Sequence, residues 1–184
     1  MSKGKLLVIS GPSGVGKGTI VKEVLKRRPQ ASLSISCTTR APRAGEEDGI
    51  SYFFISKQEF EDKIAQGGFL EYSQHFGNFY GTPKTFVEEK LLQGDVILEI
   101  EVDGALNVKR VKPDATLVMI APPDEKTLYS RLKGRGTEDE EVIARRMDRM
   151  AYELSKSELY DYVIVNDVLD RAVEEVVRIL EKEN

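Results

Sequence analysis

Residues 11–19 read GPSGVGKGT and directly follow the apolar run KLLVIS at residues 5–10. The spacing of Gly11, four residues, Gly16 and Lys17 is that of a phosphate-binding loop. In such a loop, glycines let successive backbone N–H groups face phosphate oxygens, and the following helix adds its positive end. We therefore expect this loop to bind the phosphates of a nucleoside triphosphate through Gly11, Pro12, Ser13, Gly14, Val15, Gly16, Lys17, Gly18 and Thr19.

Gly18 departs from the usual pattern, because many such loops carry a Ser or Thr whose hydroxyl binds Mg²⁺ at this position. Glycine has no hydroxyl, and Thr19 comes one residue late. The GKGT form resembles the loop of nucleoside monophosphate kinases such as adenylate kinases. By that resemblance the departure weakens the case for a GTPase or a motor ATPase and favours a kinase acting on small molecules. An N-K-x-D guanine motif is also missing, since Asn166, Asp167 and Val168 do not match it.

Composition further limits the classes of protein to which this chain can belong. The 184 residues are 40% hydrophobic and 32% charged, as in one soluble globular protein, and no apolar run approaches the ~20 residues of a membrane span. A net charge of −4 argues against a protein that coats nucleic acid. Cys37 and His75 stand alone, which excludes an internal disulfide and argues against a zinc site. We expect a cytoplasmic protein with no membrane or nucleic-acid partner, either a monomer or a small homo-oligomer.

Apolar strand patterns alternate with helical patterns along most of the chain. Strands are expected at residues 5–10, 96–102, 115–121 and 160–166, with helices at 16–28, 138–157 and 169–182 among others. This alternation predicts a parallel sheet covered on both faces. The block of about residues 35–82 breaks it with hairpin-like strands and a helix capped by Ser56 and Glu59, so we interpret it as a β-rich insertion.

Four stretches resemble guanylate kinase, in that family's order and spacing. They are GPSGVGKGT, SISCTTRAPRAGEEDGISYFF (34–54), FLEYSQHFGNFYGT (69–82) and RLKGRGTEDEEVIARRM (131–147). The resemblance implies an α/β fold: a three-layer P-loop core with a parallel sheet, an inserted β-rich GMP-binding domain and a helical lid. The boundaries would be core 1–34, GMP-binding insertion 35–82, core 83–125, lid 126–150 and core 151–184. The implied reaction is transfer of the γ-phosphoryl group of ATP to GMP, with Mg²⁺ as cofactor and dGMP left open as a second acceptor.

Two arginines and two tyrosines of the insertion have side chains that can bind a phosphate group. Arg40 and Arg43 lie in a loop near a Pro and Gly turn, where two guanidinium groups can converge on one phosphate. Tyr52 and Tyr80 can add hydroxyl donors. The resemblance places the GMP phosphate clamp on these four residues.

The resemblance places Glu71 at the position that reads the guanine base. A carboxylate accepts the adjacent N1–H and N2–H₂ donors of guanine, whereas adenine presents an acceptor at N1. By resemblance, Ser36 and Thr82 flank the base edge, and Glu101 lies on the guanosine side. The family usually carries aspartates at the positions of Glu99 and Glu101 and a glutamine at that of Asp103, so the roles of these three acids stay open.

Catalysis is assigned to Lys17 and to lid arginines. Phosphoryl transfer to an ionised phosphate needs no general base; the protein must position the groups and neutralise the charge on the transferred group. The resemblance gives these roles to Arg131, Arg135 and Arg146, with Arg149 open and Arg145 expected to pair with Glu141. His75 is expected to be exposed in a turn, and Cys37 to pack beside the sheet.

Two other functions stay open at this point. One is a kinase for AMP, UMP or dTMP, against which Glu71 argues. The other is a guanylate-kinase-like binding module that has lost catalysis, against which the intact Gly11, Gly14, Gly16 and Lys17 argue.

Overall fold

The computed structural model describes residues 4–75, 77–124, 126–127, 129–130 and 140–182. Within these ranges, five parallel strands form the central sheet in the order β2-β7-β1-β8-β9. Their bounds are Leu6–Ser10 (β1), Ser32–Leu33 (β2), Val96–Glu99 (β7), Thr116–Ala121 (β8) and Tyr162–Val165 (β9). Because β1 lies in the middle, the loop that follows it emerges at the centre of the sheet edge.

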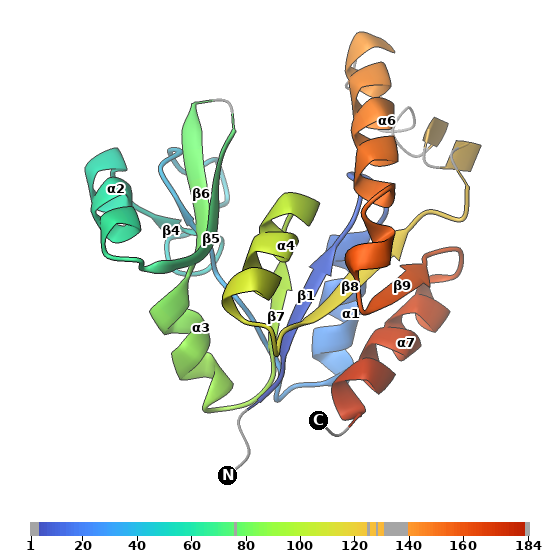
Figure 1. Cartoon of the computed structure of the whole chain (residues 1–184), viewed down its shortest axis with the longest axis horizontal. Helices are drawn as coiled ribbons and strands as arrows, with labels where there is room; N and C mark the ends of the chain where they lie inside the picture. Colours follow the sequence, from blue (N-terminus) through green and yellow to red (C-terminus); the bar gives the residue numbers. More distant parts are fainter. Residues whose placement is uncertain (1–3, 76, 125, 128, 131–139, 183–184) are drawn as a thin grey trace.

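Helices cover both faces of this sheet (Figure 1). Alternate side chains of β1 face opposite sides, as a strand requires. Leu7 and Ile9 pack with α1 (Lys17–Arg27) and α7 (Leu169–Glu181). Leu6 and Val8 pack with α3 (Lys84–Leu91) and α4 (Val102–Val111). The predicted parallel sheet between two helical layers is therefore confirmed.

A second sheet lies between β2 and β7 in the chain, with the strand order β4-β3-β6-β5. Its strands are β3 (Cys37–Thr38), β4 (Phe53–Phe54), β5 (Phe69–His75) and β6 (Asn78–Pro83), and β5 and β6 form an antiparallel hairpin. The helix α2 (Lys57–Ala65) begins with the predicted capping box of Ser56 and Glu59. Phe60 of α2 is fully buried and stacks on Phe69 and Phe79 of the hairpin, with ring centroids 4.3 and 5.2 Å apart. We call this β-rich unit the insertion.

The helix α6 (Glu140–Leu154) is followed by the short helix η1 (Ser157–Leu159). Figure 1 shows α6 and the β5–β6 hairpin rising on opposite sides of the sheet edge where the strands end. The predicted lid, residues 126–150, includes the first part of α6, whereas residues 131–139 lie outside the described residues. No described helix has the length and apolar character needed to cross a membrane. The domain boundaries given above remain predictions.

Candidate functional site

The glycine loop connects β1 to α1, and its shape depends on contacts with distant strands. Gly11 has a φ of 140°, and a Cβ atom there would lie 2.2 Å from the carbonyl oxygen of Ile120. Gly16 has a φ of 102°, and a Cβ atom would lie 2.6 Å from Nδ2 of Asn166. The same Nδ2 donates a hydrogen bond of 2.8 Å to the carbonyl of Val15. Buried Asn166, just after β9, therefore supports the loop, a role that the sequence did not indicate.

A cavity of about 500 Å³ lies above this loop. We call it the loop cavity. Seven of the nine predicted ATP-binding residues line it: Gly11, Ser13, Gly14, Gly16, Lys17, Gly18 and Thr19. The other two, Pro12 and Val15, are buried and support the loop through their carbonyl groups. The remaining lining residues are Glu99, Glu101, Arg146, Arg149 and Glu153.

Lys17 lies at the floor of the loop cavity. Its Nζ donates to the carbonyl oxygens of Gly11 at 2.6 Å and Pro12 at 3.1 Å. Burial lowers the pKa of Lys17, and the carboxylates of Glu99, Glu153 and Glu101 oppose that shift. The ammonium group is thus held at the loop, among acids that favour its charged form.

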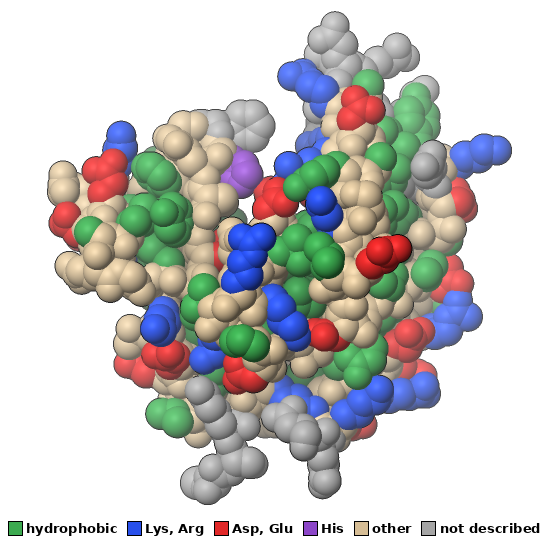
Figure 2. Space-filling model, in the orientation of Figure 1, with side chains coloured by type: hydrophobic (Ala, Val, Ile, Leu, Met, Phe, Trp, Pro, Cys, Tyr) green, Lys and Arg blue, Asp and Glu red, His purple; other side chains and the backbone are tan. Residues whose placement is uncertain are grey.

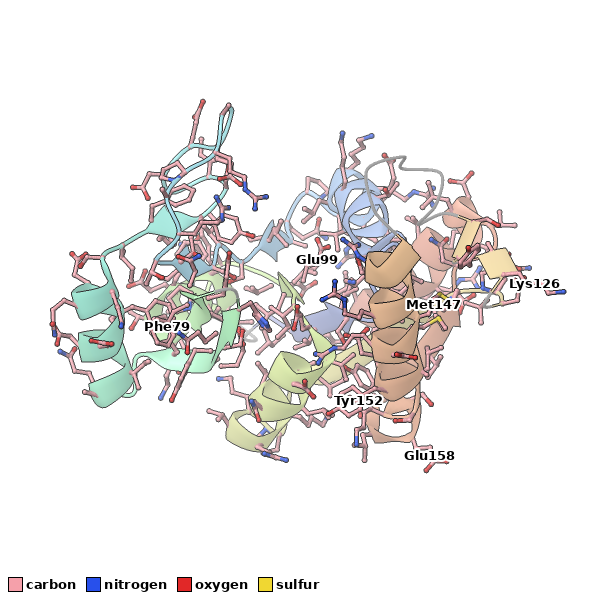
Figure 3. All side chains as sticks on the ribbon, turned by 90° about the horizontal axis from the view of Figure 1, so that it is seen from above. Phe79, Glu99, Lys126, Met147, Tyr152 and Glu158 are labelled. Carbon is pink, nitrogen blue, oxygen red and sulfur yellow. The ribbon has the colours of Figure 1, made fainter. Side chains whose placement is uncertain are left out.

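Gly18 lies beside the carboxylate of Glu99, and the absence of a side chain at Gly18 leaves space there. A Cβ atom at Gly18 would lie 3.5 Å from Oε1 of Glu99, so a serine or threonine side chain here would project toward that carboxylate. Figure 3 shows Glu99 between the insertion and α6. Surrounding protein atoms raise the pKa of Glu99, and Lys17 partly counteracts this, although the side chain still reaches solvent. The carboxylate therefore occupies the space beside the missing hydroxyl.

The helix α6 brings basic groups to the loop cavity. Arg146 donates a hydrogen bond of 2.9 Å from Nη1 to Oγ of Ser13, which joins the predicted lid to the glycine loop. Arg131 and Arg135, the other predicted lid arginines, lie outside the described residues. Arg149 contacts Glu153 at 3.0 Å, Asp103 at 3.1 Å and Glu101 at 3.5 Å.

Glu153 is a residue that the sequence analysis missed. It is 5% exposed and lines the loop cavity, and burial raises the pKa of its carboxyl group. Its spacing of four residues from Arg149 was the available signal, because such pairs meet on one helix face. Beneath the same region, buried Ser10 and Tyr160 share a hydrogen bond between their hydroxyls, and burial raises the pKa of Tyr160 to about 12.

A second cavity, of about 450 Å³, lies between the insertion and the core. We call it the insertion cavity. Six of the eight predicted GMP-binding residues line it: Ser36, Arg43, Tyr52, Glu71, Tyr80 and Glu101. Its other lining residues are Ser73, His75, Gly81, Glu99, Ile100, Asp103 and Gly104. Glu99 and Glu101 line both cavities, so the two spaces meet at the end of β7.

Glu71 is held in a fixed position within the insertion cavity. The fully buried Thr82, on the neighbouring strand β6, donates a hydrogen bond of 2.6 Å from its hydroxyl to Oε1 of Glu71. On the other side, a Cβ atom at Gly104 would lie 2.9 Å from Oε2, so only glycine leaves the carboxylate its place. Burial raises the pKa of Glu71, and the Thr82 hydrogen bonds partly offset the rise. Thr82 itself is not a lining residue; it orients Glu71.

Arg40 is also absent from the cavity lining. Its guanidinium binds Glu46 through two hydrogen bonds of 2.9 Å and lies over the ring of Tyr52, 5.4 Å from the centroid. The carboxylate of Glu46 therefore occupies the bidentate face of Arg40, a partner that the sequence did not indicate. An incoming phosphate would have to displace this carboxylate or bind beside it.

The structure contradicts the expectation for His75 and confirms the burial expected for Cys37. His75 does not lie exposed in a turn: it is the last residue of β5, it is half-buried, and it lines the insertion cavity. His75 belongs to the strand and not to a turn, because it pairs with Asn78 across the hairpin. Cys37 is buried as expected, but it lies within strand β3 of the insertion and not beside the sheet, and burial raises the pKa of its thiol to about 11.

A family model, curated relatives and a solved structure that match this chain are all guanylate kinases. The family model of guanylate kinase matches residues 3–183. A guanylate kinase of Streptococcus pneumoniae is 50% identical over 99% of this chain and 88% of its own length. One from Synechocystis is 48% identical over 98% of this chain and 95% of its own length. The crystal structure of guanylate kinase from Anaplasma phagocytophilum superposes with a TM-score of 0.75 at 31% identity, covering 98% of this chain and 86% of that one.

Proposed function

Because the chain belongs to the guanylate kinase family, it is an ATP:GMP phosphotransferase, and we propose how its two cavities divide the reaction. ATP binds in the loop cavity and GMP in the insertion cavity. The observation that carries this assignment is that both cavities are lined by Glu99 and Glu101. Two nucleotides bound on either side of these acids bring the γ-phosphoryl group and the acceptor phosphate together, as direct transfer requires.

Glu71 reads the guanine base. Its carboxylate is acceptor-only when ionised, which matches the adjacent N1–H and N2–H₂ donors of guanine. Thr82 and Gly104 hold it on two sides, so the acceptor atoms keep one geometry. AMP would place an acceptor against this buried carboxylate, and an unpaired buried group of this kind gives strong discrimination. Ser36 supplies a hydroxyl at the edge of the same cavity.

Arg43, Tyr52 and Tyr80 hold the phosphate of GMP from the cavity wall. Arg40 joins them by exchanging Glu46 for the phosphate, since a guanidinium binds either anion with the same two-bond geometry. Arg40 lies over the ring of Tyr52, and a side-chain hydrogen bond links it to Tyr80, so it is close to two of these residues. Four donors then fix the acceptor without any need for a general base.

Lys17 and Arg146 neutralise the charge that develops on the transferred phosphoryl group. Lys17 lies at the loop, and Arg146 reaches Ser13 of the same loop from α6. By family resemblance, Arg131 and Arg135 add to this set. Closure of α6 over the loop excludes water and so protects ATP from hydrolysis.

Mg²⁺ is the proposed cofactor, and the chemistry of the loop cavity suits it. Hard divalent cations prefer oxygen ligands and keep several waters when they bind to nucleotide phosphates. Glu99 and Glu101 supply carboxylate oxygens beside the loop, whereas Gly18 supplies none. Within the described ranges, no cluster of three His, Cys, Asp or Glu residues could bind a metal without the nucleotide. Glu99 and Glu101 would be the residues that hold the hydrated ion, which would supply positive charge to offset that of the phosphates.

The test is ADP production from ATP and Mg²⁺ with GMP, dGMP, AMP, UMP and dTMP offered one at a time. Turnover confined to guanine nucleotides is the expected result. Equal turnover with AMP would contradict the role of Glu71. A folded protein that binds GMP but transfers no phosphoryl group to any acceptor would indicate a binding module instead.

A further inference from the structure

His75 faces the core from the tip of the insertion. Its Nε2 atom is buried and lies 3.3 Å from Oε2 of Glu101, yet the two are not aligned for a hydrogen bond. In the described part of the chain, this nitrogen has no other hydrogen-bond partner. Figure 2 shows the chain's one histidine, in purple, with an acidic side chain, in red, beside it in this view.

Glu101 has a second basic neighbour on its other side. The same Oε2 lies 3.5 Å from Nη2 of Arg149 on α6. Arg149 is anchored there by Asp103 and Glu153, and Tyr152 donates a hydrogen bond of 2.9 Å to Asp103. One carboxylate, at the residue preceding α4, therefore lies between a group of the insertion and a group of α6.

The misaligned contact between His75 and Glu101 favours a small movement of the insertion toward the core. A buried nitrogen without an aligned partner is unfavourable, and a small shift of the hairpin toward Glu101 would remove that penalty. Once His75 holds Glu101 in one rotamer, less side-chain entropy remains to be lost when Arg149 binds the same carboxylate. Ordering on either side therefore favours ordering on the other.

We propose that His75 is a positioning residue that couples GMP binding in the insertion cavity to ATP binding in the loop cavity, through Glu101 and Arg149. The inference rests on the proposed placement of the two nucleotides. His75 lines the insertion cavity and is not among the described residues that line the loop cavity. Any effect of His75 on ATP affinity must therefore pass through the residues between the cavities.

The experiment is calorimetric titration of the β,γ-imido analogue of ATP, with Mg²⁺, in the absence and presence of saturating GMP. The ratio of the two dissociation constants is the coupling factor. In the unaltered protein, we expect GMP to tighten analogue binding about 5-fold or more, within the usual range of coupling between sites. His75→Leu should lower this factor at least about threefold while leaving analogue affinity without GMP unchanged.

Three further variants sharpen the test. His75→Gln retains a donor near the Nε2 position and should restore the coupling factor. Gln74→Leu changes the neighbouring residue on the opposite face of β5 and should behave as the unaltered protein. In a Glu101→Gln background, His75→Leu should cause no further loss, because the two residues act in series.

The outcomes separate the inference from the function on which it rests. A coupling factor near one in the unaltered protein, or one unchanged by His75→Leu, would overturn the inference. A His75→Leu protein that loses GMP affinity but keeps its coupling factor would make His75 a direct GMP contact and would also overturn it. Failure of the unaltered protein to bind GMP would contradict the proposed function itself.

Discussion

The loop cavity takes seven of its lining residues from the nine consecutive positions 11–19, whereas the insertion cavity draws on segments from Ser36 to Gly104. We propose that the loop cavity binds its nucleotide chiefly through backbone N–H groups, whose direction follows from local conformation. The insertion cavity would bind through side chains, among them those that β5, β6 and the start of α4 bring together. A local substitution should therefore damage the loop cavity by removing its charge, and the insertion cavity by disturbing its packing.

The largest effect is expected for Lys17→Ala. Loss of the one positive side chain contributed by the loop should reduce kcat by about 10²–10³-fold, since its contribution is greatest in the transition state. The fold should persist, because within the described part of the chain the hydrogen bonds of the Lys17 side chain go to loop carbonyls. Steady-state kinetics with GMP, together with circular dichroism, measures both effects. Lys22→Ala, in the exposed part of α1, is the control, and near-normal turnover of Lys17→Ala would remove this residue from the mechanism.

Glu71→Gln tests the insertion cavity in the same way. An amide offers one acceptor and presents donors to the guanine N–H groups, so the preference for GMP over AMP in kcat/KM should fall about 100-fold. The loss should appear mainly in KM for GMP, while KM for ATP stays unchanged. Glu89→Gln, an exposed carboxylate on α3, is the control. Unaltered selectivity in Glu71→Gln would assign base reading to another residue.

Gly104→Ala distinguishes the two cavities most directly, because it changes no polar group. The added Cβ would lie 2.9 Å from Oε2 of Glu71, which must then move. We expect KM for GMP to rise about 10-fold, as for loss of one well-placed hydrogen bond to a charged group. Asn107→Ala on the exposed face of α4 controls for changed helix propensity. Ordinary GMP kinetics in Gly104→Ala would show that the carboxylate is not held as described.

The smallest effect concerns pH. Burial raises the pKa of Glu71, so as pH falls this residue takes up a proton earlier than an exposed glutamate does. KM for GMP should therefore begin to rise at a higher pH than exposed carboxylates would cause, and Glu71→Gln should lack this dependence. ATP binding at the backbone-built loop should show no matching change, and a parallel rise in KM for ATP would argue against Glu71 as the titrating group.

The contribution of Glu71 to folding stability should change with pH in the direction opposite to that of GMP binding. A carboxyl group whose folded pKa is raised destabilises the fold when ionised, and that cost disappears as pH falls through the raised pKa. Relative to the unaltered protein, Glu71→Gln should therefore gain stability at pH 7 and lose this advantage in acid. Urea denaturation at several pH values measures the difference.

The sequence alone determined the phosphate-binding loop, the alternating core and the β-rich block, because each depends on spacing within a short segment. Gly11 and Gly16 supply the backbone conformation of the loop and Lys17 its charged side chain, all within one short motif, and the alternation of Leu6 to Ile9 already specifies two buried faces. Family resemblance added Glu71 and its neighbours at positions that the structure brings to one cavity.

Only the tertiary structure decided which distant groups meet. Asn166 supports the glycine loop from β9, Gly104 leaves space for Glu71, and Glu101 lies between His75 and Arg149. None of these pairs has a characteristic spacing, since their separation along the chain depends on how the helices and strands pack. Side-chain contacts between separate elements follow from that packing, whereas local motifs follow from the backbone, and for this reason the sequence indicated the loop more completely than the insertion cavity.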